Sequence, residues 1–244
     1  MNFLDDVHNP TFRTGLWADC PWLAAMHDPS IGYGVFEDFT NIDAATLAGY
    51  TATPQASGTF TLGTAVGGTG ILDSGANTQH QGINVQKLGP CFLPAAGLDI
   101  WFECLLSTTF PGFLEFFAGL ADVDTTLMPT GNLDFGNSEY IGFGIETTLA
   151  GVMSFYASDA GAELNDSLGA VGTLVTGTQM KMGFKVTGIT GIQCWINDVE
   201  IALTNVVAAG IPVIDVLTPT FVCQTDGTSQ PIVSLDWYKA FQLR

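Results

Sequence analysis

Short apolar runs, separated by glycine and other turn-forming residues, constrain most strongly what this chain can fold into. Several of them alternate apolar and polar residues, which is the two-residue period of a strand with one buried face. The clearest runs are 83–86, 98–107, 113–121, 140–146, 152–157, 179–186, 191–203, 218–224 and 232–243. No long stretch has the 3.6-residue period of an amphipathic helix. The pattern predicts an all-β protein built as a sandwich of two antiparallel sheets.

One hairpin can be placed in detail. Two apolar runs, 193–196 and 199–202, flank the pair Asn197 and Asp198. Both of these residue types tolerate a positive φ, which both central positions of a type I′ turn require. We therefore predict a two-residue hairpin turn at this pair.

The first 30 residues do not share the strand pattern. They contain Trp17 and Trp22, two histidines and several prolines. We predict an N-terminal arm over residues 1–30, which packs on the main domain or on a neighbouring subunit, and a sandwich domain over residues 31–244. Residues 1–10 contain Asp5 and Asp6 but no basic residue, so we expect no secretory signal there.

The charge of the chain excludes two classes of partner. Asp and Glu number 24 against only six Lys and Arg, which gives a net charge of −18. Nucleic-acid binding depends on basic side chains that neutralise phosphates, and anionic membranes repel an acidic surface. No apolar stretch reaches the ~20 residues of a membrane span. We expect neither partner. The negative charge then keeps the protein soluble, or it attracts a calcium-rich or cationic partner surface.

The five cysteines, at positions 20, 91, 104, 194 and 223, suggest reduced thiols. Their odd number and wide spacing match neither a disulfide framework nor a zinc site. Cys104 and Cys194 lie inside strand-like runs, where a free cysteine behaves as a small apolar residue. We expect a chain that is made in a cytosol.

The acidic residues of the strands do not form a catalytic pattern. Retaining glycosidases need two carboxyl groups ~5 Å apart, and β-sandwich glycosidases set them on one strand face. Glu103, Glu115 and Glu146 each stand alone in their predicted strands. The three histidines, His8, His27 and His80, show no metal-binding spacing, and no nucleophile elbow is present. We expect no catalytic residue, and a protein that is not an enzyme.

Asp122 and Asp124 are the candidate metal ligands, because alternate carboxylates in a loop can bind a hard cation such as calcium. The alternative is a polar loop whose aspartates form turns or caps. Asp159, Glu163 and Asp166 form a second acidic loop with the same two interpretations. Apart from possible calcium, we expect no cofactor.

Three tryptophans, Trp101, Trp195 and Trp237, lie in predicted strands. A sugar-binding protein can use such rings as a stacking platform. Burial in the core explains aromatic residues in strands better, and we predict that role for them.

The final third of the chain carries a family resemblance. A strand at 181–186 precedes the hairpin at 194–201, and an apolar-Asp-Trp strand at 234–238 closes the chain. This order resembles the C-terminal half of concanavalin A-like (laminin G-like) jelly rolls. Three further segments, 97–103, 117–126 and 139–143, are similar to concanavalin A-like structural proteins of tailed-phage virions, particularly capsid decoration (cement) proteins.

The resemblance implies a jelly-roll domain and a structural role on the outside of a phage head. The expected partners are further copies of the chain, as a dimer or trimer, and the major capsid protein. The expected location is the outer capsid surface, after assembly in the host cytoplasm. A carbohydrate-binding adhesin or fibre module remains an alternative, followed by a glycoside hydrolase. The paired acids of the glycosidases and a clear lectin metal loop are missing, so no site residue is transferred.

Overall fold

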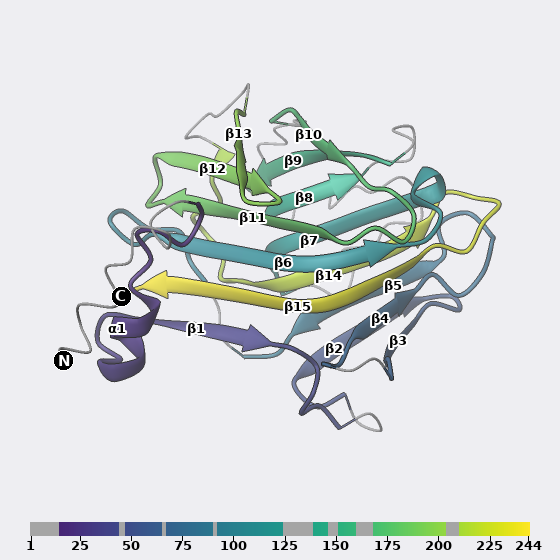
Figure 1. The fold of residues 1–244 in the computed structure, drawn as a ribbon, viewed down its shortest axis with the longest axis horizontal. Helices are drawn as coiled ribbons and strands as arrows, with labels where there is room; N and C mark the ends of the chain where they lie inside the picture. Colours follow the sequence, from purple (N-terminus) through teal and green to yellow (C-terminus); the bar gives the residue numbers. More distant parts are fainter. Residues whose placement is uncertain are drawn as a thin grey trace.

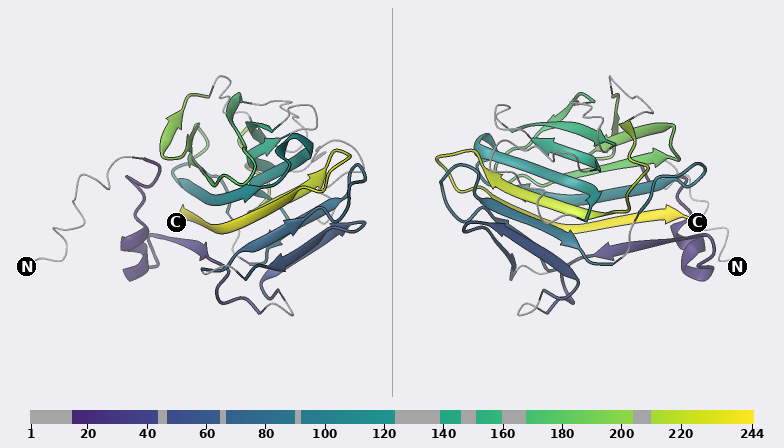
Figure 2. Two further views of the ribbon diagram at one scale, coloured as in Figure 1. Left: turned by 45° about the vertical axis from the view of Figure 1, so that its right-hand side comes forward. Right: turned by 180° about the vertical axis from the view of Figure 1, so that it is seen from behind.

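The computed structural model describes residues 15–43, 47–64, 67–89, 92–123, 139–145, 151–159, 168–203 and 210–244. Two antiparallel sheets face each other across an apolar interior (Figure 1, Figure 2). This confirms the predicted all-β sandwich. In the described part of the chain, no helix has the length and apolarity needed to span a membrane.

The eight-stranded sheet lies at the front in Figure 1. Seven of its strands are hydrogen-bonded in sequence across the sheet, and β1 (Gly32–Glu37) pairs with β15 beside them. Their order is β13 (Val199–Ile201), β12 (Gly191–Ile196), β11 (Met180–Thr187), β6 (Ile100–Thr108), β15 (Ile232–Leu243), β4 (Gly70–Asp73) and β3 (Thr59–Leu62).

The seven-stranded sheet lies behind it. Its order is β10 (Ala170–Thr173), β9 (Val152–Ser158), β8 (Tyr140–Ile145), β7 (Leu114–Asp122), β14 (Leu217–Thr225), β5 (Gly82–Lys87) and β2 (Tyr50–Gln55). A 3-10 helix, Pro111–Phe113, precedes β7 in the connection from the first sheet. Because β6 and β7 are consecutive in the chain but lie in different sheets, this connection joins the two layers.

Aromatic rings fill the space between the sheets. Phe102 and Phe184 of the eight-stranded sheet stack with ring centroids 5.2 Å apart. Phe155 of the seven-stranded sheet meets Phe184 edge to face at 5.3 Å, and Phe143 at 5.0 Å. All four rings are fully buried. Edge-to-face and offset-stacked pairs add to the stabilisation that burial provides, so this cluster fixes how the sheets pack.

The predicted hairpin is confirmed. Asn197 and Asp198 have φ values of 49° and 68°, and they join β12 to β13. The side-chain oxygen of Asn197 accepts a hydrogen bond from the backbone N–H of Lys181, at 3.0 Å. The Lys181 ammonium also lies 2.5 Å from the Asp198 carboxylate. These contacts attach the turn to the neighbouring strand β11.

Two strands, β2 and β4, lie in the segment 50–75, which is rich in Thr, Ala and Gly and contains none of the clearest apolar runs of the sequence. β2 pairs with β5 along its whole length, and β4 pairs with β15. The partners lie far away in the chain, so non-local pairing makes these residues strands although their own pattern is weak.

The described part of the N-terminal segment, from residue 15, holds a turn and the helix α1 (Trp22–His27) before β1 begins. It lies at the end of the sandwich where β15 ends, beside the C-terminus (Figure 1, Figure 2). The Arg244 guanidinium donates a hydrogen bond to the Pro29 carbonyl at 2.9 Å, and the Arg244 backbone N–H donates to Ile31. The C-terminal residue is therefore bonded directly to the connection between α1 and β1.

Candidate functional site

Each sheet has one face toward the core and one outward face, because successive side chains of a strand point to opposite sides. On β7, Phe116, Ala118 and Leu120 belong to the core between the sheets. The alternate residues Glu115 and Phe117 therefore face outward. The two outward faces are the surfaces on which a site could be built, and they differ strongly.

A row of polar residues, here called the polar face, lies on the outward side of the seven-stranded sheet. It consists of Asn84, Gln86, Glu115, Thr220 and Gln224, and each of these residues is at most 3% exposed. Strand register places Gln224 beside Glu115 and Gln86 beside Thr220. The Gln86 amide donates to the Thr220 hydroxyl at 3.1 Å and to the backbone carbonyl of Asp122 at 2.7 Å.

Glu115 is the most unusual residue of the polar face. Its side chain is fully buried, and among the described residues none forms a hydrogen bond to either carboxylate oxygen. The nearest cationic candidate is His80, whose Nδ1 lies 3.8 Å from Glu115 Oε1. His80 has a φ of 61°, a left-handed conformation that is strained for a residue other than glycine.

Burial raises the pKa of Glu115 to about 8, with a smaller contribution from the negative charge of Asp226. The carboxyl group is therefore largely protonated at neutral pH and can act as a hydrogen-bond donor or an acid. The sequence identified Glu115 as an isolated acid. It did not identify His80 as its neighbour, because His80 lies in the connection before β5 and Glu115 in β7, far apart in the sequence.

The two described acids that the sequence offered as candidates, Glu103 and Glu115, do not form the pair that a glycosidase needs. Glu103 lies on β6 and faces outward from the eight-stranded sheet, where it bonds the arm, whereas Glu115 faces outward from the other sheet. The two carboxylates thus lie on opposite sides of the sandwich. Glu146 lies outside the described residues.

The predicted metal ligands are only partly described. Asp122 ends β7, where its backbone carbonyl accepts the Gln86 amide. Asp124 lies outside the described residues, as do Glu163 and Asp166. In the described part of the chain, no three His, Cys, Asp or Glu side chains gather as a metal site would require.

Glu139, which the sequence did not single out, is a buried acid with defined partners. Its carboxylate accepts hydrogen bonds from the backbone N–H groups of Ile214, at 3.1 Å, and Asp215, at 2.8 Å. Burial raises its pKa, the two backbone hydrogen bonds oppose that shift, and a hydrogen bond with the side chain of Asp159 adds to it. Glu139 therefore holds the segment before β14 against the start of β8 and forms a pair of carboxyl groups with Asp159.

The outward side of the eight-stranded sheet, here called the arm face, consists of two rows across the strands. Strand register aligns Lys185, Trp101, Phe241 and Gly34 in one row, and Trp195, Gly183, Glu103 and Lys239 in the other. Each row thus contains one glycine among large side chains, which leaves a gap in the surface.

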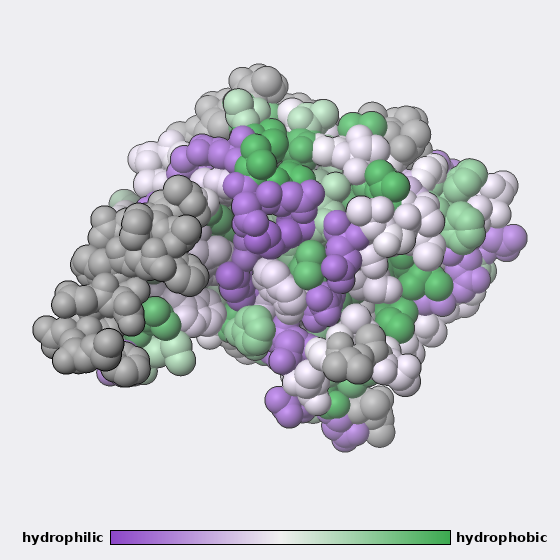
Figure 3. Space-filling view, in the orientation of Figure 1, coloured by the Kyte–Doolittle hydropathy of each residue, from purple (hydrophilic) through white to green (hydrophobic). Residues whose placement is uncertain are grey.

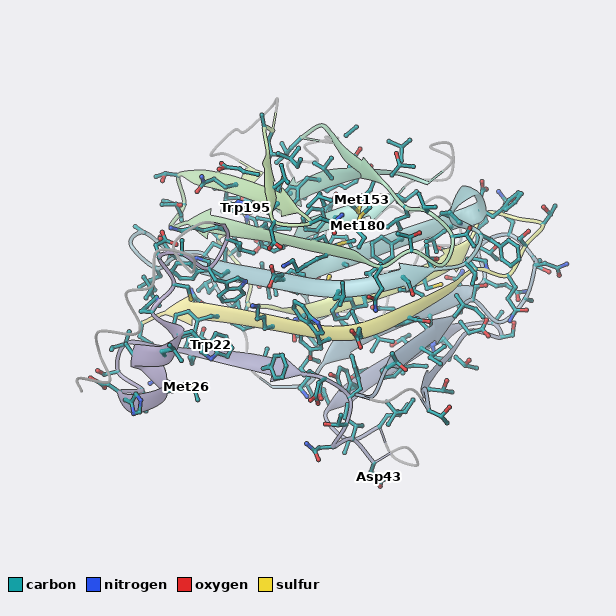
Figure 4. The ribbon with its side chains drawn as sticks, in the orientation of Figure 1. Trp22, Met26, Asp43, Met153, Met180 and Trp195 are labelled. Carbon is teal, nitrogen blue, oxygen red and sulfur yellow. The ribbon has the colours of Figure 1, made fainter. Side chains whose placement is uncertain are left out.

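The arm fills both gaps. A Cβ atom added to Gly183 would lie 2.4 Å from the Leu16 side chain, and one added to Gly34 would lie 2.7 Å from the Trp22 ring. Trp22 also packs against Phe241, with ring centroids 5.5 Å apart. Figure 4 shows Trp22 between α1 and β1. The arm face therefore has the shape of the segment that covers it.

Charged groups attach the arm at two points. The Trp17 indole donates to the Glu103 carboxylate at 3.0 Å, and the Lys239 ammonium lies 2.9 Å from the same oxygen. At the second point Asp19 forms an ion pair with Lys185 and accepts a hydrogen bond from the Trp101 indole at 3.3 Å.

The arm therefore uses two of the few cations of this chain. Each of the five basic side chains in the described ranges has a partner, since Lys87 pairs with Glu37, Lys181 with Asp198, and Arg244 with the Pro29 carbonyl.

In the view of Figure 3, which faces the eight-stranded sheet, hydrophilic residues gather over the middle of that sheet. The basic groups are used within the fold, which leaves the acidic excess for the surface.

The tryptophans are buried largely as predicted, but two of them lie beneath the arm and not between the sheets. Trp101 and Trp195 are 1% and 8% exposed, and they pack in the cluster beneath the arm rather than between the sheets, while Trp237 is half-buried.

The four described cysteines are free. Burial raises the pKa of the Cys20 and Cys194 thiols to about 12, so neither is a reactive thiolate at neutral pH.

No family model and no curated protein matches the sequence. Among solved structures, the chain is similar to a protein of unknown function from Shewanella oneidensis MR-1, with a TM-score of 0.60 and 14% identity over 88% of this chain and 87% of that one. Peanut lectin matches with a TM-score of 0.57 and 11% identity over 87% and 98% of the two chains.

An endo-1,3-β-glucanase from Streptomyces sioyaensis also matches, with a TM-score of 0.52 and 10% identity over 88% and 98%. The fold is a concanavalin A-like jelly roll. At these identities the similarity establishes the fold alone, and that fold serves both sugar-binding proteins and glycosidases.

Proposed function

We propose that this protein is a non-enzymatic structural component of a virus particle, a decoration (cement) protein on the outer surface of a tailed-phage head. It binds the major capsid protein and further copies of itself, and it assembles in the host cytoplasm. The proposal starts from the similarity of segments 97–103, 117–126 and 139–143 to such proteins.

The arm face supports the non-enzymatic part, because it is closed to solvent at its centre. Trp101 and Glu103 are 1% and 5% exposed and lie beneath the arm. Small-molecule sites are concave and open to their ligand. The arm face is instead a packed scaffold surface.

The charge supports a position outside the shell. The net charge is −18, and the described basic groups are paired within the fold. Such a surface repels the phosphates of packaged nucleic acid. A protein on the outside of a head avoids that contact.

Heads that lack this protein provide the test. Purified protein added to such heads is expected to co-sediment with them in a saturable way, and to raise the temperature at which they release their DNA. Mass spectrometry of complete particles is expected to detect the chain in amounts comparable to a shell protein. Absence of the chain from purified particles, or no binding to heads at saturating concentration, would overturn the proposal.

A carbohydrate-binding adhesin or fibre module is the second candidate, and the similarity to lectins favours it. Under this function a glycan array detects binding, and a chelator abolishes it if Asp122 and Asp124 hold calcium beside the sugar. Asp122→Asn is the matched variant, because it keeps the shape of the side chain and removes its charge. Binding that survives both the chelator and this variant would exclude the calcium-dependent form.

A glycoside hydrolase is the weakest of the three, since the candidate acids Glu103 and Glu115 lie on opposite sides of the sandwich. Release of reducing ends from β-glucans by the wild-type protein, and its loss in Glu115→Gln, would be needed to support it.

A further inference from the structure

We propose that neighbouring copies of this chain exchange their N-terminal arms, so that the segment from Leu16 to Trp22 of one copy occupies the arm face of the next. This inference rests on the proposed structural role, in which copies lie side by side on a shell. It identifies the surface that joins them and the segment that fills it.

The arm fits its site. Gly183 and Gly34 leave gaps that Leu16 and Trp22 fill, and Leu16 is only 4% exposed. Trp17 and Asp19 add a charged contact on either side of Leu16. An isolated apolar patch could be covered by many proteins, whereas this surface is complementary in shape and charge to one segment of the same sequence.

The arm is held on its face by side chains. Trp17 and Asp19 contact the arm face through their side chains, without a shared strand. The exposed residues 28–30 connect α1 to the residues that lead into β1, and Arg244 holds this connection at Pro29 and Ile31. Exchanging an identical element through such a connection forms the same contacts in the dimer as in the monomer, which makes it a low-cost route to assembly.

The helix α1 leaves part of its surface uncovered. Leu23 and Met26, three positions apart on this helix, are 57% and 70% exposed. Figure 4 shows Met26 on the outer side of α1, away from the sandwich. In an exchanged pair α1 lies between two bodies, where these side chains gain a neighbour, and on a crowded shell the high local concentration favours the exchange.

Charge reversal provides a reciprocal test. Asp19→Lys places two lysines together in one chain, and Lys185→Glu places two acids together, so each variant alone loses its arm contact. If arms exchange, an equimolar mixture restores both pairs across the two chains. Light scattering coupled to size exclusion should then detect a stable heterodimer that neither variant forms alone. A mixture that remains the sum of its two components would contradict the exchange.

The double variant Asp19→Lys/Lys185→Glu is the matched control, because it restores an ion pair in one chain and should have the oligomeric state of the wild-type protein. Its stability is expected to be lower, since Asp99, 3.1 Å from Lys185, would face Glu at position 185 and the Trp101 indole would lose its acceptor. If a single variant fails to fold, a disulfide gives an independent answer. In a Cys20→Ser background, Asp19→Cys/Lys185→Cys is oxidised at high protein concentration. A covalent dimer on a non-reducing gel supports exchange, and a cross-linked monomer alone contradicts it.

These outcomes are distinguishable from failure of the proposed function. If the chain is found on heads but its oxidised cysteine variant is purely monomeric, the structural role stands and the arm exchange is rejected. A chain absent from particles loses the structural role, whatever the gel shows.

Discussion

The arm face and the polar face bury charged groups in opposite ways. On the arm face the Glu103 carboxylate bonds an indole N–H and an ammonium group, at 3.0 and 2.9 Å. On the polar face the Glu115 carboxyl group is more deeply buried, and among the described residues the nearest cationic candidate is His80, at 3.8 Å. Partnered buried charges are consistent with a permanent structural contact, whereas a buried acid without partners makes stability depend on pH.

The largest effect is expected at the centre of the arm face. Trp101 contacts Phe241, at 5.8 Å between ring centroids, and donates its indole N–H to Asp19. Trp101→Ala should lower the free energy of unfolding by about 4 kcal/mol, because it leaves a large cavity beneath the arm. Urea denaturation measures this loss, and limited proteolysis should show faster cleavage of the arm.

Trp101→Phe is the matched control. It retains an apolar ring, removes the hydrogen bond to Asp19 and leaves a smaller cavity than alanine does, so a loss of about 2 kcal/mol is expected. Equal losses for the two variants would mean that the ring does not support the arm, and the account of this face would need revision.

A smaller effect, with a defined pH dependence, is expected at Glu115. Its pKa is raised from 4.5 to about 8, mainly by burial, so the folded state holds a proton that the unfolded state releases between these values. This group therefore lowers stability as the pH rises from 4.5 to 8, and its effect is constant above that. Glu115→Gln should stabilise the protein at pH 8.5 by about 2 kcal/mol and change little at pH 4.5.

Glu103→Gln tests the other face with the same chemical change. Removal of the carboxylate charge leaves Lys239 without its ion pair, and a loss of about 1 kcal/mol is expected at pH 7. The comparison between the faces fails if Glu115→Gln destabilises the protein at pH 8.5 as Glu103→Gln does at pH 7. Thermal or urea unfolding across the pH range supplies both values.

The smallest effect is expected at the hairpin, away from both faces. Asp198 has a φ of 68°, which glycine adopts without strain, but its carboxylate pairs with Lys181 on the surface. Asp198→Gly should therefore change stability by at most about 0.5 kcal/mol, as the gain in the turn offsets the lost ion pair. A loss above about 1.5 kcal/mol in urea denaturation would show that the ion pair stabilises the hairpin more than the turn geometry does.

Features set by neighbouring residues could be predicted from the sequence. The hairpin at Asn197 and Asp198 depends on two adjacent residues that accept positive φ, and the long strands have apolar runs of their own. β2 and β4 could not be predicted, because their pairing with β5 and β15 supplies what their local sequence lacks.

The two faces were beyond sequence reasoning for a similar reason. In β6 the neighbours Trp101 and Phe102 are both large and apolar. They point to opposite faces of the strand, and the sequence does not show which face meets the other sheet. Strand order then places Lys185 and Phe241 on either side of Trp101. The contact between His80 and Glu115 likewise arises from non-local strand pairing. The assignment of Trp101 and Trp195 to a core was correct for burial and did not anticipate the arm.

We propose that this sandwich is a structural protein on the outside of a virus head, and cryo-electron microscopy of the intact particle that carries this chain is the decisive experiment. Density for the two-sheet jelly roll is expected on the outer surface of the shell, at symmetry-related positions. A well-resolved map of a complete particle with no such density on the head, or with the jelly roll only at the tail or fibres, would contradict it.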